Sequence, residues 1–106
     1  MDINILGTKY DFQFDTTENQ ELVNAYGVCL IFDKKIIVRK QSLIDGVSQD
    51  AKKYRHDHVI RHELIHAIAE ESGVQYGNDE ALVDWIAHII PLVNRAYDEI
   101  INNEQE

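Results

Sequence analysis

The pattern of apolar and polar positions divides the chain into an extended first part and a helical second part. Aromatic residues alternate with polar ones across 9–14, an apolar run occupies 3–6, and a Gly7-Thr8 pair separates them, so these segments predict a β-hairpin. β-Branched and aromatic residues dominate 26–32 and 35–40, which predict a second hairpin. The first part of the chain is therefore expected to form a small antiparallel sheet.

The second part shows helical spacing from about residue 50. A cap at or near Asp50 and the glycine at position 73 delimit a helix over 50–72, whose apolar face comprises Val59, Ile60, Leu64, Ile65 and Ile68. Gly77-Asn78 begins a second helix, which Pro91 is expected to kink or interrupt before helical spacing resumes over 92–102. Segment 18–24 fits either a short helix or a loop. The prediction is an α+β fold, with the sheet packed against two or three C-terminal helices in one domain over 1–106.

Composition and charge narrow the class of protein. The chain has 106 residues, 44% of them apolar, and a formal net charge of −9. This acidity argues against nucleic acid or an anionic membrane as a partner. The single cysteine, Cys29, cannot form an internal disulfide and is expected to be a buried structural thiol. The sequence shows no basic leader and no apolar stretch of about 20 residues, so a cytoplasmic protein is expected.

The chemistry is concentrated in His62-Glu63-Leu64-Ile65-His66, an H-E-x-x-H motif inside the first predicted helix. Positions four apart lie one above the other on a helix, so both histidines can bind one metal ion, and imidazole nitrogen suits zinc. Glu63 is rotated to the side of that ion, where it can take a proton instead of binding the metal. Because zinc lowers the pKa of a water molecule bound to it to about 7, this spacing predicts a hydrolytic site.

A third ligand has to come from outside the first helix. His58 extends the histidine pair into an i, i+4, i+8 stripe, but its outer members are separated by about 12 Å of helix rise. Three successive turns cannot close around one ion with bonds of about 2.1 Å, so His58 is expected to be a surface histidine. The same geometry excludes Glu70.

The acidic start of the second helix supplies better candidates. A short turn brings the start of one helix opposite the end of the other, which favours Glu80 as the third ligand, with Asp79 as the alternative. Asp84 lies one turn after Glu80 and is placed to accept the spare N–H of a ligating histidine. Without the upstream motif, these acidic residues would be interpreted as partners of the helix dipole that face water.

The two motifs together resemble the gluzincin metallopeptidases, in which H-E-x-x-H is followed by a separate helix bearing N-E-x-x-x-D. The counterpart here is Asn78-Asp79-Glu80-Ala81-Leu82-Val83-Asp84, with an additional aspartate before the glutamate. The chain is also similar to small metallopeptidases encoded by phages and prophages, through ILGTKY near the start, then RHELIHA, EESG, and NDEALVDWIA followed by a proline. The resemblance implies a zincin-like fold with these roles: His62, His66 and Glu80 as zinc ligands, Glu63 as general base, and Asp84 as the residue that orients a ligand.

Three functions follow as hypotheses. The first is a zinc-dependent metallopeptidase that hydrolyses a peptide or protein substrate. The second is a non-catalytic zinc-binding interaction or regulatory protein of phage or prophage type, and the third is a protein without metal. For a peptidase, 35–40 is a candidate edge strand that pairs with the substrate backbone, although its basic residues also suit protection against edge-to-edge aggregation. The candidate oxyanion donors are His88, Tyr54, Tyr76 and Tyr97.

Overall fold

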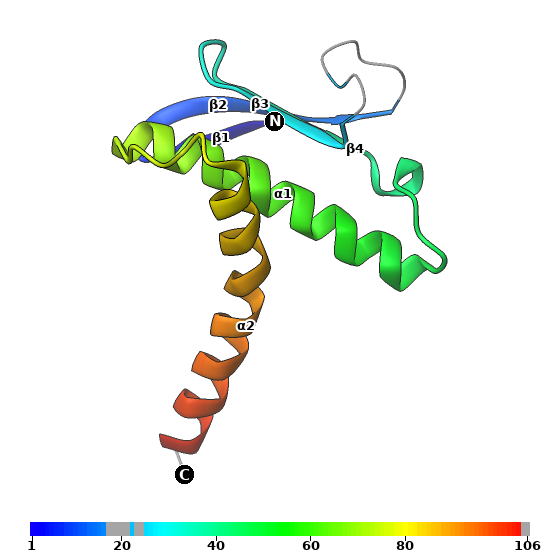
Figure 1. Ribbon diagram of the computed structural model, residues 1–106, viewed down its shortest axis with the longest axis vertical. Helices are drawn as coiled ribbons and strands as arrows, with labels where there is room; N and C mark the ends of the chain where they lie inside the picture. The colour runs from blue at the N-terminus through cyan, green and yellow to red at the C-terminus, as the bar shows by residue number, and fades with distance from the viewer. Residues whose placement is uncertain (17–21, 23–24, 105–106) are drawn as a thin grey trace.

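The computed structural model describes residues 1–16, 22 and 25–104, which form one sheet and two long helices (Figure 1). The strands are β1 (Asp2–Ile5), β2 (Thr8–Asp15), β3 (Gly27–Leu30) and β4 (Lys35–Arg39). A short 3-10 helix, η2 (Gln41–Leu43), leads to the helices α1 (Gln49–Ser72) and α2 (Glu80–Glu104). The predicted α+β class is confirmed with two helices, but the expectation that both pack against the sheet is wrong, because α1 covers the sheet and α2 packs mainly against α1. Segment 18–24, left open between helix and loop, lies outside the described residues apart from Leu22.

Both predicted hairpins are present, but the sheet they form is mixed. Ile5 lies opposite Thr8, so Leu6 and Gly7 make a two-residue turn in which both have positive φ, as hairpin turns of this length require. β3 and β4 also pair antiparallel. The two hairpins join through β2 and β4, which run parallel, and the strand order is β1-β2-β4-β3. The prediction of an antiparallel sheet is therefore wrong.

The burial of β4 accounts for this arrangement. Ile36, Ile37 and Val38 are 0% exposed although successive residues point to opposite faces of the sheet, and such a strand belongs in the sheet interior. The residues of β3 are only partly buried, and β3 forms an edge of the sheet. The prediction that 35–40 is an edge strand is wrong, because β3 occupies that position.

Both ends of α1 have the expected chemistry. Ser48 caps the N-terminus, since its Oγ accepts a hydrogen bond from the backbone N–H of Ala51 at 3.1 Å. Gly73 ends the helix in the left-handed conformation with a φ of 75°, as predicted. The last turn is also tied to the sheet, because Glu71 accepts hydrogen bonds from Lys34 Nζ at 2.7 Å and from Tyr10 Oη at 2.8 Å.

The hydrophobic core lies between α1 and one face of the sheet. Its buried members are Ile5, Tyr10, Phe12, Ile36, Val38 and Ala67. Val59, Ile60 and Leu64 of the predicted apolar face pack against it, whereas Ile68 is 46% exposed and does not belong to it. This packing sets the rotation of α1, and with it the direction in which the H-E-x-x-H side chains point.

α2 leaves the end of α1, contacts it, and then projects away from the rest of the molecule (Figure 1). Asp79 caps its N-terminus, because its Oδ1 accepts a hydrogen bond from the backbone N–H of Leu82 at 3.0 Å. The helix continues through Pro91, so the predicted interruption is wrong. Among the described residues, no helix combines the length and apolar character that a membrane span needs.

A side chain of α1 explains why Pro91 is tolerated. Proline has no N–H to donate to the carbonyl four residues earlier, which in α2 belongs to the fully buried Ala87. Arg61 Nε donates to that carbonyl at 3.0 Å and so replaces the missing helical hydrogen bond. The contact also fixes the position of α2 on α1, one residue before the motif histidine His62.

Arg61→Ala is expected to lower the free energy of unfolding by about 1–2 kcal/mol, because the buried Ala87 carbonyl loses its donor. In a Pro91→Ala background, Arg61→Ala should lower the free energy of unfolding by less. The alanine at position 91 has a backbone N–H that can donate to the Ala87 carbonyl in place of Arg61. Urea unfolding of the four chains in this double-mutant cycle measures the coupling. Arg95→Ala, at an exposed position of α2, is the control, and an equal cost of Arg61→Ala in both backgrounds would contradict this account.

Candidate metal centre

The motif histidines converge on one point beside the start of α2. His62 Nε2 and His66 Nε2 lie 3.3 Å apart, and both side chains are largely buried. The first turn of α2 adds Glu80, whose Oε2 lies 3.0 Å from His62 Nε2 and whose Oε1 lies 2.8 Å from His66 Nε2. The structure therefore brings together the three residues that the sequence proposes as ligands.

These distances fit a metal ion. Two donors bonded to zinc at about 2.1 Å in a tetrahedral arrangement lie about 3.4 Å apart, close to the separation of the two histidine nitrogens. The Glu80 oxygens are a few tenths of an ångström closer, a difference that a small rotation of this exposed side chain removes. Among the described residues, His62, Glu63 and His66 form one group of side chains that could hold a metal ion, and His58, His62 and Asp84 form a second.

The tautomer of His66 supports the same conclusion. Its Nδ1 lies 2.6 Å from the carbonyl oxygen of Gly77, which can only accept, so Nδ1 carries the proton. In the neutral ring Nε2 then presents a lone pair, directed at a carboxylate oxygen of Glu80. Two acceptors at 2.8 Å are stable only with a cation or a proton between them. The sequence missed this role of Gly77, because it belongs to a backbone carbonyl.

Asp84 links the site to a third histidine. Its Oδ1 accepts a hydrogen bond from His58 Nε2 at 2.6 Å and lies 3.4 Å from His62 Nδ1. The hydrogen bond from His58 lowers the pKa of the Asp84 carboxyl, and the charges of His58 and His62 add to this effect. Asp84 thus stands beside the spare nitrogen of a proposed ligand, as expected. His58 is not a solvated surface residue, since it is largely buried and holds Asp84 in place.

Asp84→Asn is expected to weaken zinc binding about 10–100-fold, because the amide keeps the shape but loses the charge that orients and polarises His62. Competition against a chromogenic chelator measures the dissociation constant. Asp98→Asn makes the same chemical change on an exposed part of α2 and should leave the affinity unaltered. Equal affinities of the two variants would show that Asp84 does not support the metal.

Glu63 is the buried carboxylate of the site, with 7% of its surface exposed. Burial raises the pKa of Glu63, and the charges of His62 and His66 oppose the shift in part. Gly27 of β3 passes directly over this side chain: a Cβ at Gly27 would lie 3.1 Å from Glu63 Oε2 and 2.7 Å from Val59 Cγ1. A buried carboxyl with a raised pKa beside candidate metal ligands accepts a proton more readily than an ordinary glutamate, and is therefore suited to proton transfer.

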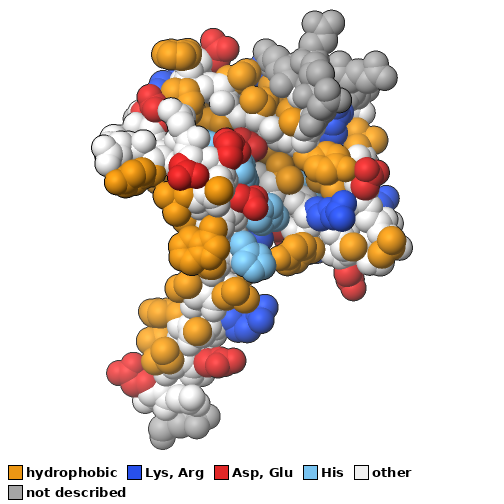
Figure 2. Space-filling model, viewed as in Figure 1, with side chains coloured by type: hydrophobic (Ala, Val, Ile, Leu, Met, Phe, Trp, Pro, Cys, Tyr) orange, Lys and Arg blue, Asp and Glu red, His pale blue; other side chains and the backbone are white. Residues whose placement is uncertain are grey.

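A groove runs past these donors. On one side, a polar cavity of about 470 Å³ lies between β3 and the turn before α2, lined by residues that include Val28, Cys29, His66 and Glu70. On the other side, an apolar hollow of about 540 Å³ is lined by residues that include Tyr26, Tyr54 and Trp85. A smaller cavity beside His62 and Glu63 lies between them. Figure 2 shows the histidines gathered where α2 meets the rest of the molecule.

Cys29, predicted to be a buried structural thiol, is less buried than expected. Its side chain packs against the core but is only partly buried, and it lines the polar cavity. Burial raises the pKa of the thiol to about 12, and the charge of Glu63 contributes to this shift. With this raised pKa, the Cys29 thiol is protonated and forms part of the wall of the cavity.

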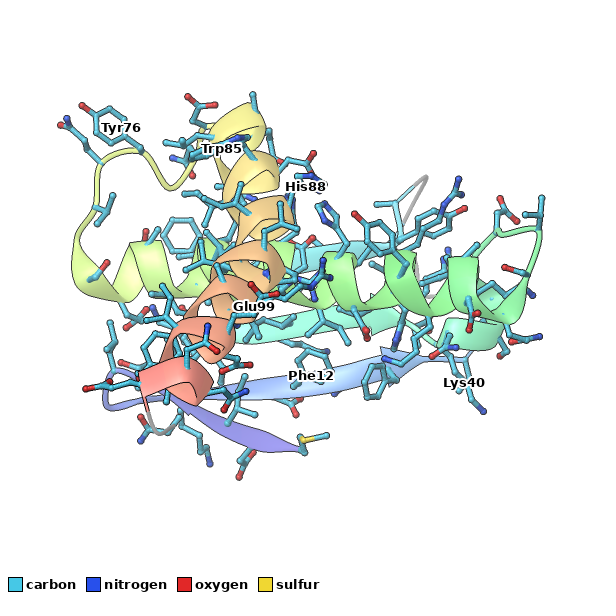
Figure 3. The ribbon with its side chains drawn as sticks, turned by 90° about the horizontal axis from the view of Figure 1, so that it is seen from below. Phe12, Lys40, Tyr76, Trp85, His88 and Glu99 are labelled. Atoms are coloured by element: carbon cyan, nitrogen blue, oxygen red, sulfur yellow. The ribbon has the colours of Figure 1, made fainter. Side chains whose placement is uncertain are left out.

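The structure separates the candidate oxyanion donors. Tyr54 Oη and His88 Nδ1 lie 3.3 Å apart and line the apolar hollow. Tyr76 points away from the α1–α2 contact (Figure 3), and Tyr97 lies on the projecting half of α2. Tyr26, which the sequence analysis missed, reaches the small cavity beside His62, and its hydroxyl donates to Asp45 Oδ2 at 2.9 Å.

A scan against protein-family models finds no match for this chain, and searches of curated proteins and of solved structures find none either. The zincin-like identity expected from the two motifs thus stays a prediction. The function has to be argued from the geometry of the site.

Proposed function

We propose that the chain is a zinc-dependent metallopeptidase with a gluzincin-like site, acting on peptide or protein substrates in the cytoplasm. One observation carries the proposal: donor atoms of His62, His66 and Glu80, from two helices, converge within 3.3 Å of one another beside a buried glutamate. These atoms are acceptors when both rings are neutral and Glu80 is ionised, so a metal ion or a proton has to lie between them, and two imidazole nitrogens with a carboxylate form a donor set that suits zinc.

Each residue has a distinct task. His62, His66 and Glu80 would hold the ion, which supplies Lewis acidity toward the substrate carbonyl and lowers the pKa of water to about 7. Glu63 accepts a proton from the attacking water and passes it to the departing amine, a task that its raised pKa favours. Asp84 and the Gly77 carbonyl keep the two imidazole rings in orientation.

The groove accommodates an extended peptide. β3 is an edge of the sheet, and Gly27, Val28 and Cys29 of this strand line the polar cavity. A substrate backbone can therefore add to this strand, while the apolar hollow around Trp85 receives a large side chain. This assignment transfers to β3 the role that the sequence analysis gave to 35–40.

The proposal is tested with a mixture of fluorogenic peptides of varied sequence, incubated with zinc-loaded protein and with protein stripped by a chelator. Cleavage that depends on zinc and disappears in a His66→Ala variant is the expected result. Tight binding of one zinc ion per chain with no cleavage of any peptide or unfolded protein would instead support the zinc-binding interaction protein. No zinc binding after reconstitution would contradict both functions.

A further inference from the structure

The projecting half of α2 exposes a series of large apolar side chains. The exposed fractions are 48% for Leu92, 58% for Val93, 60% for Tyr97 and 66% for Ile100. Figure 2 shows apolar side chains along this helix, and Figure 1 shows no other described element beside its C-terminal half. A single exposed leucine or isoleucine is ordinary, but a contiguous apolar surface marks an interaction site.

These side chains form one stripe. Ile86, Val93 and Ile100 follow a seven-residue spacing, and Ile89 and Ala96 fall between them, so the a and d positions of two heptads are apolar. The buried residues Val83 and Ala87, by contrast, lie on another side of the helix and accompany the contact with α1. Ile86 borders a small cavity against α1, so the stripe begins at the edge of the contact that holds α2 on α1 and continues onto the projecting half.

We propose that this stripe, defined by Ile86, Ile89, Val93, Ala96 and Ile100 with Leu92 and Tyr97 at its margins, pairs with the same stripe of a second copy. The four exposed side chains of the projecting half together present about 500 Å² of apolar surface, so two copies would bury about 1,000 Å², the lower limit for a specific interface. A twofold axis needs only one self-complementary patch, and an apolar heptad stripe is self-complementary.

The charge of the helix argues against a membrane as the occupant. An amphipathic helix that lies on a membrane carries lysine and arginine on its polar face. The polar positions after Pro91 include Arg95 alone as a base against Asp98, Glu99 and Glu104. An anionic surface would therefore repel this helix, whereas in a dimer Asp98 and Glu99 fall outside the apolar stripe and their repulsion is screened by salt.

The test is sedimentation velocity at several protein concentrations up to about 100 µM, a range in which a micromolar dimer dissociates on dilution. The wild-type chain should reach twice its mass of 12.3 kDa. The double variant Val93→Glu/Ile100→Glu should remain monomeric over the whole range, because it places charges in the stripe. The double variant Asn94→Glu/Asn102→Glu adds the same charges outside the stripe and should still dimerise.

Each other outcome overturns the proposal. A wild-type chain that is monomeric throughout excludes the dimer, and a dimer that survives Val93→Glu/Ile100→Glu must use another surface. Flotation of the wild-type chain, but not of this variant, with phosphatidylserine-containing vesicles would assign the stripe to a membrane. Circular dichroism is the control for folding. All variants should keep their helices, because the substituted residues are exposed.

Discussion

Glu63→Gln is expected to lower the rate constant of peptide hydrolysis by at least about 100-fold while the protein still binds zinc. The amide has nearly the shape of the carboxyl and can keep its place under Gly27, so the fold and the three proposed ligands should not change. It cannot accept a proton from the attacking water, and that loss affects the chemical step. The expected signature is a lower kcat with little change in KM.

Glu70→Gln is the matched control for this experiment. Glu70 lines the same cavity and undergoes the same chemical change, but it is exposed and makes no contact with the converging ligands. Its hydrolysis rate should stay within about threefold of wild type. If Glu63→Gln bound zinc and hydrolysed peptides at the wild-type rate, Glu63 would not be the general base and the proposed mechanism would be wrong.

Glu80→Ala is expected to weaken zinc binding more than about 100-fold, beyond the range typical of a residue that only supports a ligand. One of its oxygens lies 3.0 Å from His62 Nε2 and the other 2.8 Å from His66 Nε2, which places Glu80 to complete the site. Elemental analysis after dialysis against a weak chelator measures the zinc that each variant retains. Wild-type protein should hold one ion per chain under the same conditions.

Asp79→Ala distinguishes a ligand from a helix cap. Asp79 was the alternative third ligand, but its carboxylate accepts the hydrogen bond of the Leu82 N–H. Removal of this carboxylate should therefore lower the free energy of unfolding by about 1 kcal/mol, and most of the zinc should stay bound. Zinc lost from Asp79→Ala and kept by Glu80→Ala would reverse the assignment, and zinc kept by both would exclude a ligand from this turn.

The sequence by itself determined the features that depend on neighbours in the chain. Any α-helix places His62 and His66 on one face, because that spacing follows from the helical repeat. The two hairpins and the left-handed Gly73 also follow from local patterns. The first turn, however, lies at Leu6-Gly7, one residue before the predicted Gly7-Thr8, and places Leu6 at a positive φ that local preference disfavours. The position of Glu80 beside His62 and His66 was predicted because a short turn limits how two consecutive helices can lie. This contact therefore also depends on residues that are close in the sequence.

Only the tertiary structure decided the relations between distant segments. The parallel pairing of β2 with β4 depends on which strand can be buried on both faces, and it makes β3 the edge beside the site. Pro91 breaks a helix by the local rule, but Arg61, twenty-six residues before Ala87, supplies the missing donor. The contact of His58 with Asp84 and the passage of Gly27 over Glu63 likewise require the packed fold. Local preferences are encoded over a few residues, whereas these contacts exist only once the core has fixed the helices against the sheet.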